Sequence, residues 1–188
     1  ARTTHGMVVV DADIRLIHAT FHSNCGGETM NAEDVWSKAE PYLRATTDTF
    51  CTNAPHALWR RAIGRDEWLN YLRAKYRVDI NDSEVVAAAT AQLPSCRELY
   101  LNGVSPLVPI EQVRTDWKLN SAFFSIGTEG DHLLFSGKGF GHGVGLCQEG
   151  AMRMARAGVP FTEILHHYYA DVHIVDLTTL DFFRDVGE

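Results

Sequence analysis

Most hydrophobic residues of this 188-residue chain occur in short runs, separated by polar and glycine-containing segments. Met7–Val10 and Ile14–Phe21 are two such runs, joined by Asp11-Ala12-Asp13, and this pattern predicts a β-hairpin. Further short strands are expected at Leu58–Ile63, Arg97–Leu101, Val108–Thr115, Ala122–Gly127, His132–Ser136 and His173–Leu177. The glycine, proline and asparagine residues between these segments keep the strands short.

Fewer segments have helical character. Asp66–Lys75 carries apolar residues at helical spacing, and Asp82–Gln92 is rich in alanine, with Ser83 as its expected N-cap. Helices are also expected at Cys147–Ala157 and from Pro160 to about Tyr169, with a short helical turn at Asn31–Ser37. The pattern as a whole predicts an α+β fold of mostly short antiparallel strands with a few packed helices. One domain over residues 1–188 is expected, with room for a small helical subdomain at about residues 57–95.

The composition is that of a globular domain, and it narrows the class of partner. The chain is 45% hydrophobic and 22% charged, and its net charge of -7 disfavours nucleic acid and anionic membrane surfaces. No apolar run approaches the roughly 20 residues of a transmembrane helix. The chain opens with polar residues rather than a signal peptide and runs straight into a strand-like segment, so a fragment or a trimmed product is expected.

The densest chemical signal is the glycine-rich run from Gly137 to Gly150, in which five alternate residues from Gly137 to Gly145 are glycine. A strand with glycine on one face lets a ligand or another backbone approach closely. The run leads into a helix N-terminus, whose free N–H groups can bind an oxygen or an anion, but it lacks the spacing of a phosphate loop. Tight packing of a strand on a helix is the alternative explanation. His142 and Gln148 within the run favour a binding site.

A second polar loop, Phe21–Thr29, also combines small residues with glycines. One chemistry open to the two loops is a cysteine–histidine nucleophile, and another is a zinc site if the loops meet. The residues that both ideas would use are His22, Cys25, His142 and Cys147. The acids near these loops, which are candidates for acid–base work on a glycosidic bond, are Glu28, Asp34 and Glu149.

Two longer motifs carry a family resemblance. Gly139–Ala151 reads Gly-Phe-Gly-His-Gly-Val-Gly-Leu-Cys-Gln-Glu-Gly-Ala, and Phe21–Thr29 is followed by Asp34-Val35-Trp36 and Pro41-Tyr42-Leu43. The first resembles the C-terminal motif of the sporulation stage II protein D family, and the second resembles its earlier motif, His-Ser-x-x-Gly-Gly-x-Thr. The order and spacing agree as well, and the resemblance extends from about Thr4 to Leu177.

The resemblance implies a domain that processes peptidoglycan glycan strands, within a lytic transglycosylase of the cell wall. In that family one glutamate protonates the glycosidic oxygen and the sugar's own hydroxyl closes an anhydro ring, whereas glycoside cleavage commonly uses two carboxylates. Related domains are described as amidase enhancers, so a non-catalytic wall-binding or amidase-stimulating module is the main alternative, and a cysteine hydrolase is another. The implied partners are glycan strands and a cell-wall amidase. The implied location is extracytoplasmic: periplasmic, in the cell wall, or anchored to a membrane through a missing N-terminus.

The sequence also departs from the family pattern. The family's catalytic glutamate and the His/Cys zinc motif of some members lie upstream of the matched motifs, so no residue here is assigned as catalytic or as a metal ligand. Ala1-Arg2-Thr3 is similar to the family's Ala-Arg-Thr motif, but the strand that follows aligns better with the segment after the zinc region. Cys25 and Cys147 stand where the family commonly has serine, which argues against a nucleophile or a zinc site built on these thiols.

The residues that match both motifs are expected to line a glycan cleft. His142 and Gln148 are expected to hydrogen-bond sugar hydroxyls or acetamides, and Trp36 is expected in the core rather than stacked on a sugar. No cofactor is expected. The residues assigned to substrate binding are Ser23, Gly26, Gly27, Thr29, Gly141, His142, Gly143 and Gln148.

Overall fold

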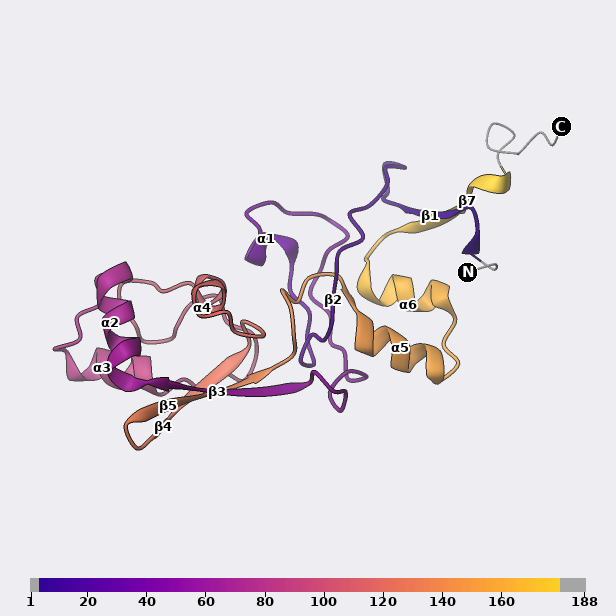
Figure 1. The fold of residues 1–188 in the computed structure, drawn as a ribbon. Helices are drawn as coiled ribbons and strands as arrows, with labels where there is room; N and C mark the ends of the chain where they lie inside the picture. Colours follow the sequence, from indigo (N-terminus) through magenta and orange to yellow (C-terminus); the bar gives the residue numbers. More distant parts are fainter. Residues whose placement is uncertain (1–3, 180–188) are drawn as a thin grey trace.

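The computed structural model describes residues 4–179, which form an α+β fold, so the expected fold class is confirmed (Figure 1). Ala1-Arg2-Thr3, compared above with a family motif, lies outside the described residues. The strands are β1 (Met7–Val10), β2 (Phe21–His22), β3 (Leu58–Gly64), β4 (Phe124–Glu129), β5 (His132–Lys138), β6 (Leu146–Cys147) and β7 (His173–Asp176). The helices are α1 (Ala32–Val35), α2 (Arg65–Tyr76), α3 (Ser83–Thr90), α4 (Ile110–Trp117), α5 (Gln148–Arg156) and α6 (Phe161–Tyr168), followed by a 3-10 turn at Leu177–Thr179.

The strands form three small sheets. β3, β5 and β4 make an antiparallel sheet in that order, β1 pairs antiparallel with β7, and β2 pairs parallel with β6. The register of β3 on β5 runs from Leu58 opposite Lys138 to Gly64 opposite His132. Residues 58–138 therefore leave and rejoin the rest of the molecule at one place, beside the glycine-rich run.

The segment from β3 to β5 has a hydrophobic core of its own, seen at the left of Figure 1. Trp68 of α2 and Phe135 of β5 are fully buried there, with ring centroids 5.2 Å apart. The Trp68 indole N–H donates to the carbonyl of Ala89 at 2.9 Å, so burying this ring leaves no polar atom without a partner. Helices α2 and α3, which lie in the expected subdomain at residues 57–95, share this core with α4, β4 and β5.

A second core lies around α5 and α6, on the other side of β2 (Figure 1). Tyr168 of α6 and Leu43 are almost completely buried in it, together with Val144 of the glycine-rich run. Much of this core comes from loops rather than from helices or strands, since residues 25–51 contribute a large share of its apolar side chains. The loops that carry the candidate site are therefore held by packing into the second core, which includes Cys25, Val144 and Cys147.

The predicted hairpin at the start of the chain is wrong over most of its length. β1 forms its ladder with β7, and only a bridge between Val10 and Leu16 remains of the expected pairing with Ile14–Phe21. Ile14 has a φ of 61°, which breaks an extended strand, and the Ile14 and Leu16 side chains are 69% and 70% exposed. Ile17 alone of the apolar side chains in this run packs against a core, so the hydrophobicity of Ile14 and Leu16 does not produce a strand.

The strand predicted at Val108–Thr115 is also wrong, because this segment begins α4. Pro109 occupies the N-cap of α4, and Ile110 and Val113, three residues apart, turn the same face into the core. Arg97–Leu101 likewise forms no strand, only a bridge from Tyr100 to Pro109. In both places the segment is short and apolar, and its burial follows a helical or irregular path rather than that of a strand.

The predicted helices are confirmed with small shifts at their ends. α3 is capped by Asp82 rather than by Ser83, because the Asp82 carboxylate accepts hydrogen bonds from the backbone N–H groups of Glu84 and Val85. α6 begins after Pro160, whose fixed φ suits a helix start.

The β3–β5 pairing depends on the absence of a side chain at Gly137. A Cβ at this position would lie 2.0 Å from Cε2 of Trp59, whose ring is fixed by a 2.9 Å hydrogen bond from Nε1 to Ser121 Oγ. We expect Gly137→Ala to lower the free energy of unfolding by about 1–3 kcal/mol in urea titrations. Gly127→Ala in β4, where the new methyl meets nothing within 4 Å, is the matched control and should change stability by less than about 1 kcal/mol. Equal effects of the two substitutions would contradict this packing.

Candidate functional site

The two sequence motifs lie against each other along much of their length. We call residues 21–30 the first loop and residues 139–147 the glycine loop. β2 at the start of the first loop pairs with β6 at the end of the glycine loop, and bridges join Asn24 to Phe140 and Met30 to Val144. The two motifs therefore lie side by side, joined by backbone pairing, and that they line a glycan cleft stays a prediction.

The glycine loop is not the strand that its alternating pattern predicted. Its glycines at 139, 141, 143 and 145 all have positive φ values, so the chain turns repeatedly instead of extending. A Cβ at Gly139 would lie 2.6 Å from the carbonyl oxygen of Asn24, and one at Gly145 would lie 2.3 Å from that of Thr20. The glycines thus serve the close approach of the first loop's backbone, which is one of the two roles considered from the sequence.

His142 is fixed by the backbone of both loops. Its Nε2–H donates to the carbonyl of Phe21 at 3.0 Å, and its Nδ1 accepts from the N–H of Val144 at 3.1 Å. Burial lowers the pKa of His142 below its ordinary value, although the bond to the Phe21 carbonyl opposes this shift, so the ring is neutral at neutral pH. With both ring nitrogens occupied, His142 has its ring face rather than a hydrogen bond to offer a ligand.

Trp36 covers that ring face. Its centroid lies 4.9 Å from that of His142, and its side chain is 39% exposed, so the expectation that Trp36 is a core residue is wrong. The signal that misled the prediction is size, since tryptophan is buried more often than not. Trp36 follows the single turn of α1, and this turn is too short to bury it.

In the described part of the chain Trp36 borders three hollows, two of which are larger than the third. One of these two has a volume of about 390 Å³, and its lining residues are His18, Ala19, Thr20, Phe21, Trp36 and His142. The other, about 660 Å³, lies between α1, the end of α2 and α4, and its lining combines apolar residues such as Val35 and Pro109 with polar ones, among them Lys75 and Glu111. An aromatic ring between hollows that combine apolar and polar lining is a surface suited to a ligand with apolar faces and polar edges.

Glu149, at the start of α5, accepts hydrogen bonds from two side chains whose proximity the sequence did not reveal. Its Oε2 accepts from Asn24 Nδ2 at 2.7 Å, and its Oε1 lies 2.8 Å from Nδ1 of His56. Burial on its own raises the pKa of Glu149, but the hydrogen bonds from Asn24 and His56 outweigh it, so the pKa lies below its ordinary value. Glu149 is therefore ionised at neutral pH and cannot serve as a proton donor there.

His22 lies beneath the two loops. It is buried, its Nδ1 lies 3.2 Å from the carbonyl of Val144, and its Nε2 has no hydrogen-bond partner. Burial, followed by the proximity of His142, lowers the pKa of His22 to about 3. A neutral, enclosed imidazole of this kind holds the loops in place and does not act as a base toward a ligand.

The other residues assigned from the sequence contribute backbone atoms, one buried side chain and one exposed side chain. The Ser23 carbonyl accepts from the N–H of Glu149 at 3.0 Å, and the Gly27 carbonyl accepts from Asp48 at 2.9 Å. Thr29 is buried, and its Oγ1 accepts from the N–H of Thr46 at 2.8 Å. Gln148 is exposed at the first position of α5. Gly26, Gly141 and Gly143 occupy left-handed backbone positions within the two loops.

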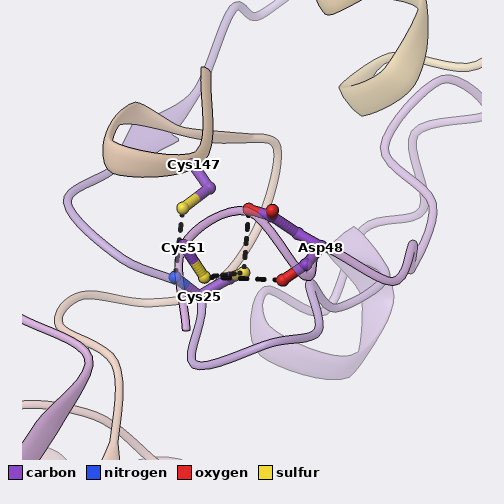
Figure 2. Close-up of side chains that lie close together, drawn as sticks. All are labelled: Cys25, Asp48, Cys51 and Cys147. Atoms are coloured by element: carbon purple, nitrogen blue, oxygen red, sulfur yellow. Dashed lines mark hydrogen bonds between the residues drawn. The ribbon is translucent and has the colours of Figure 1, made fainter. Parts of the chain in front are cut away.

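Three of the four cysteines meet in the second core, together with one carboxylate (Figure 2). These residues, all buried, are Cys25, Asp48, Cys51 and Cys147. Because Cys25 and Cys147 are completely enclosed, neither thiol can reach a substrate, and the cysteine hydrolase alternative loses its basis. Among residues 4–179 the cluster includes neither His22 nor His142, so the alternative of a zinc site made of two histidines and two cysteines does not form.

Comparison with known proteins agrees with this arrangement of motifs. The chain is 33% identical over 160 residues to stage II sporulation protein D of Bacillus amyloliquefaciens and 31% identical to that of Bacillus subtilis, each match covering 84% of the chain. The chain belongs to the stage II sporulation protein D family. It spans less than half the length of these two relatives, 45% in each case. No family model matches the sequence.

The family assignment extends to a differently named relative. The amidase enhancer of Bacillus subtilis is 24% identical over 204 residues, a match that covers 82% of the chain and 29% of that protein. In this member of the stage II sporulation protein D family, no helix within residues 4–179 is long and apolar enough to cross a membrane.

The network around Glu149 predicts a pH-dependent stability. A carboxyl whose folded pKa is depressed stabilises the fold above its unfolded pKa, about 4.3, and the contribution disappears as the pH falls through the lower folded value. We expect Glu149→Gln to lower the free energy of unfolding by about 1–3 kcal/mol at pH 7. Glu163→Gln on the exposed face of α6 is the matched control and should be neutral. A deficit of Glu149→Gln that stays constant from pH 7 to below pH 4 would contradict the assignment.

Proposed function

We propose that the chain is a peptidoglycan glycan-strand processing domain of the lytic transglycosylase type, acting outside the cytoplasm. The observation that carries the proposal is the exposed Trp36 ring, held against His142 where the two family motifs meet and bordered by hollows on either side. A glycan strand is an elongated chain of rings with apolar faces and polar edges. An aromatic face with a polar rim complements such a ligand, and the net charge of -7 does not favour a polyanion.

Within this proposal His142 acts through its position. Its two ring nitrogens bind the backbone of both loops, so it fixes Trp36 and the glycine loop in place. Gln148 is the assigned side chain that remains free to bond a hydroxyl or an acetamide, because it is exposed at the start of α5. The first loop and the glycine loop supply backbone, and they form one wall of the cleft.

Cleavage of a glycosidic bond also needs a proton donor with a raised pKa. Glu149, the buried acid at the junction of the loops, has a lowered pKa and is ionised, so it serves in positioning Asn24 and His56. We therefore assign glycan binding to these residues and the acid to a segment of the protein outside the matched motifs. The His/Cys zinc motif of some family members has no match in this sequence, and no step of the proposal uses that ion.

A second candidate function is stimulation of a cell-wall amidase. The relative named amidase enhancer favours it, and so does a wall-binding surface whose buried acid cannot donate a proton. Both candidates require glycan binding, and they differ in whether bonds are cleaved.

Binding is tested by removing the aromatic face. We expect Trp36→Ala to weaken binding to glycan strands stripped of stem peptides by about tenfold, or ~1.4 kcal/mol, in calorimetric titrations. Phe161→Ala is the matched control, because Phe161 is equally exposed at 39% but lies at the start of α6. Unchanged affinity in Trp36→Ala, with the fold intact by circular dichroism, would remove the proposed surface.

Cleavage is tested separately with the full-length protein and the same stripped glycan strands. The transglycosylase proposal expects products that end in anhydro-muramyl sugars, detected by mass spectrometry. If the full-length protein binds strands but releases no such product, and raises the rate of a cell-wall amidase, the second candidate replaces the first.

A further inference from the structure

A carboxylate and three thiols are buried together behind the two loops without a cation to balance them. Asp48 is fully enclosed, and no lysine, arginine or histidine within residues 4–179 forms an ion pair with it. An unpaired carboxylate in an apolar core is costly, so such groups are normally paired or bound to a metal. The enclosure of Asp48 among sulfur atoms therefore points to a missing positive charge.

We propose that Cys25, Asp48, Cys51 and Cys147 bind a single zinc ion (Figure 2). Their four ligand atoms all lie within 4.8 Å of one another. Cys25 Sγ is 3.3 Å from Cys51 Sγ and 3.4 Å from Asp48 Oδ2. Zinc–sulfur bonds of about 2.3 Å place two sulfur ligands of a tetrahedral ion about 3.8 Å apart, so changes of up to about 1 Å in the distances between the ligand atoms complete the site. This site goes beyond the proposed glycan function. It also replaces the expectation from the sequence that Cys25 and Cys147 hold no zinc, because Asp48 and Cys51, which belong to neither motif, complete a set of four ligands.

The donor set selects the metal. Three thiolates and one carboxylate suit zinc in tetrahedral coordination, whereas magnesium and calcium prefer six or more oxygen ligands. With four protein ligands and no exposed face, the site is closed, as structural zinc sites are. The ion would hold the fold and would not meet substrate.

The surroundings resemble those of a built metal site. Backbone N–H groups of Cys25 and Gly150 point at Cys147 Sγ, at 3.3 and 3.4 Å, and so stabilise a thiolate there. The carboxylate of Asp48 is oriented by the Tyr168 hydroxyl, which donates to Oδ2 at 2.9 Å, and by the Phe50 N–H, which donates to Oδ1 at 2.9 Å. Cys147 and Asp48 therefore both have neighbours that orient their ligand atoms.

Gly150 makes room for this arrangement. A Cβ at Gly150 would lie 2.2 Å from Asp48 Oδ2 and 2.2 Å from the Tyr168 hydroxyl oxygen. The residue follows Cys147 by three positions on α5, so one turn of helix supplies both a ligand and the space for another. The last glycine of the C-terminal motif thereby gains a role that a glycan surface alone does not require.

A disulfide explains these residues less well. The Cys25–Cys51 sulfur separation of 3.3 Å exceeds the roughly 2.05 Å of a disulfide bond. One disulfide would also leave the charge of the buried Asp48 carboxylate without a cation, since its partners Tyr168 and the Phe50 N–H are neutral hydrogen-bond donors. A zinc ion instead satisfies all four groups and ties together three segments that are remote in sequence, near residues 25, 50 and 147.

The test is the metal content of the 188-residue chain. Purified under reducing conditions and dialysed, the wild type is expected to hold about one zinc ion per chain by plasma mass spectrometry. Cys51→Ser and Cys147→Ser should each lose most of it, whereas Cys96→Ser, at an exposed cysteine outside the cluster, should keep it. Replacing zinc by Co²⁺ should give the visible absorption of a tetrahedral thiolate site.

A second measurement on the wild type guards against variants that fail to fold. Titration with a mercurial thiol reagent should release the zinc in proportion to the thiols that react, and removal of the ion should lower the melting temperature. A folded wild type that contains no zinc and takes up no Co²⁺ would overturn the proposal. So would a Cys25–Cys51 disulfide found by peptide mapping, or zinc that remains bound in Cys51→Ser and Cys147→Ser. None of these outcomes depends on glycan binding, which is measured independently.

Discussion

Backbone pairing between the first loop and the glycine loop is the constraint on which the rest of the site depends. The two segments are more than a hundred residues apart, and they approach so closely that a Cβ at Gly139 or Gly145 would collide with a carbonyl oxygen of the opposite segment. Because this pairing is made by backbone atoms, it specifies position independently of the side chains. It sets His142 against Trp36 on one side and Cys147 against Cys25 on the other.

The loops therefore separate two kinds of chemistry. Outward, they present an aromatic ring and hollows of mixed apolar and polar lining. The titratable groups behind that surface are held in fixed states, with His22 and His142 neutral and Glu149 ionised. Inward, they enclose sulfur and carboxylate groups that a divalent ion would neutralise. The outer face is suited to binding a ligand, and the inner cluster is suited to keeping the loops in their conformation. A zinc ion behind the loops would stiffen a wall that has little regular secondary structure.

Much of this architecture was predictable from the sequence, where periodicity and capping decide locally. The helices at 65–76 and 148–156 follow from apolar spacing and end signals. The strand predicted at Val108–Thr115 failed because β-branched residues also serve a helix whose buried positions are three apart, as Ile110 and Val113 show. The hairpin failed because nothing covers Ile14 and Leu16. In both cases the outcome depends on which residues remote in sequence pack against the segment, and the local pattern does not predict that packing.

The site was predictable as a pair of loops but not in its details. The two motifs can be recognised from their glycine content and order. Asp48, Cys51 and His56 belong to no motif, and only the fold brings them next to motif residues. The spacing Asp48-x-x-Cys51 was a weak signal, since two potential ligands stood on one turn of chain. His142 was predicted to hydrogen-bond a sugar, but both of its ring nitrogens form hydrogen bonds with backbone atoms whose positions the sequence does not reveal.

The central claim is that residues 21–36 and 140–149 form one glycan-binding wall. Hydrogen–deuterium exchange of the protein with and without peptide-free glycan strands tests it most directly. The account predicts slower exchange in both of these segments on binding, and little change in the sheet β3-β5-β4 with its helices. Protection confined to residues 58–138, or to only one of the two loops, would contradict it.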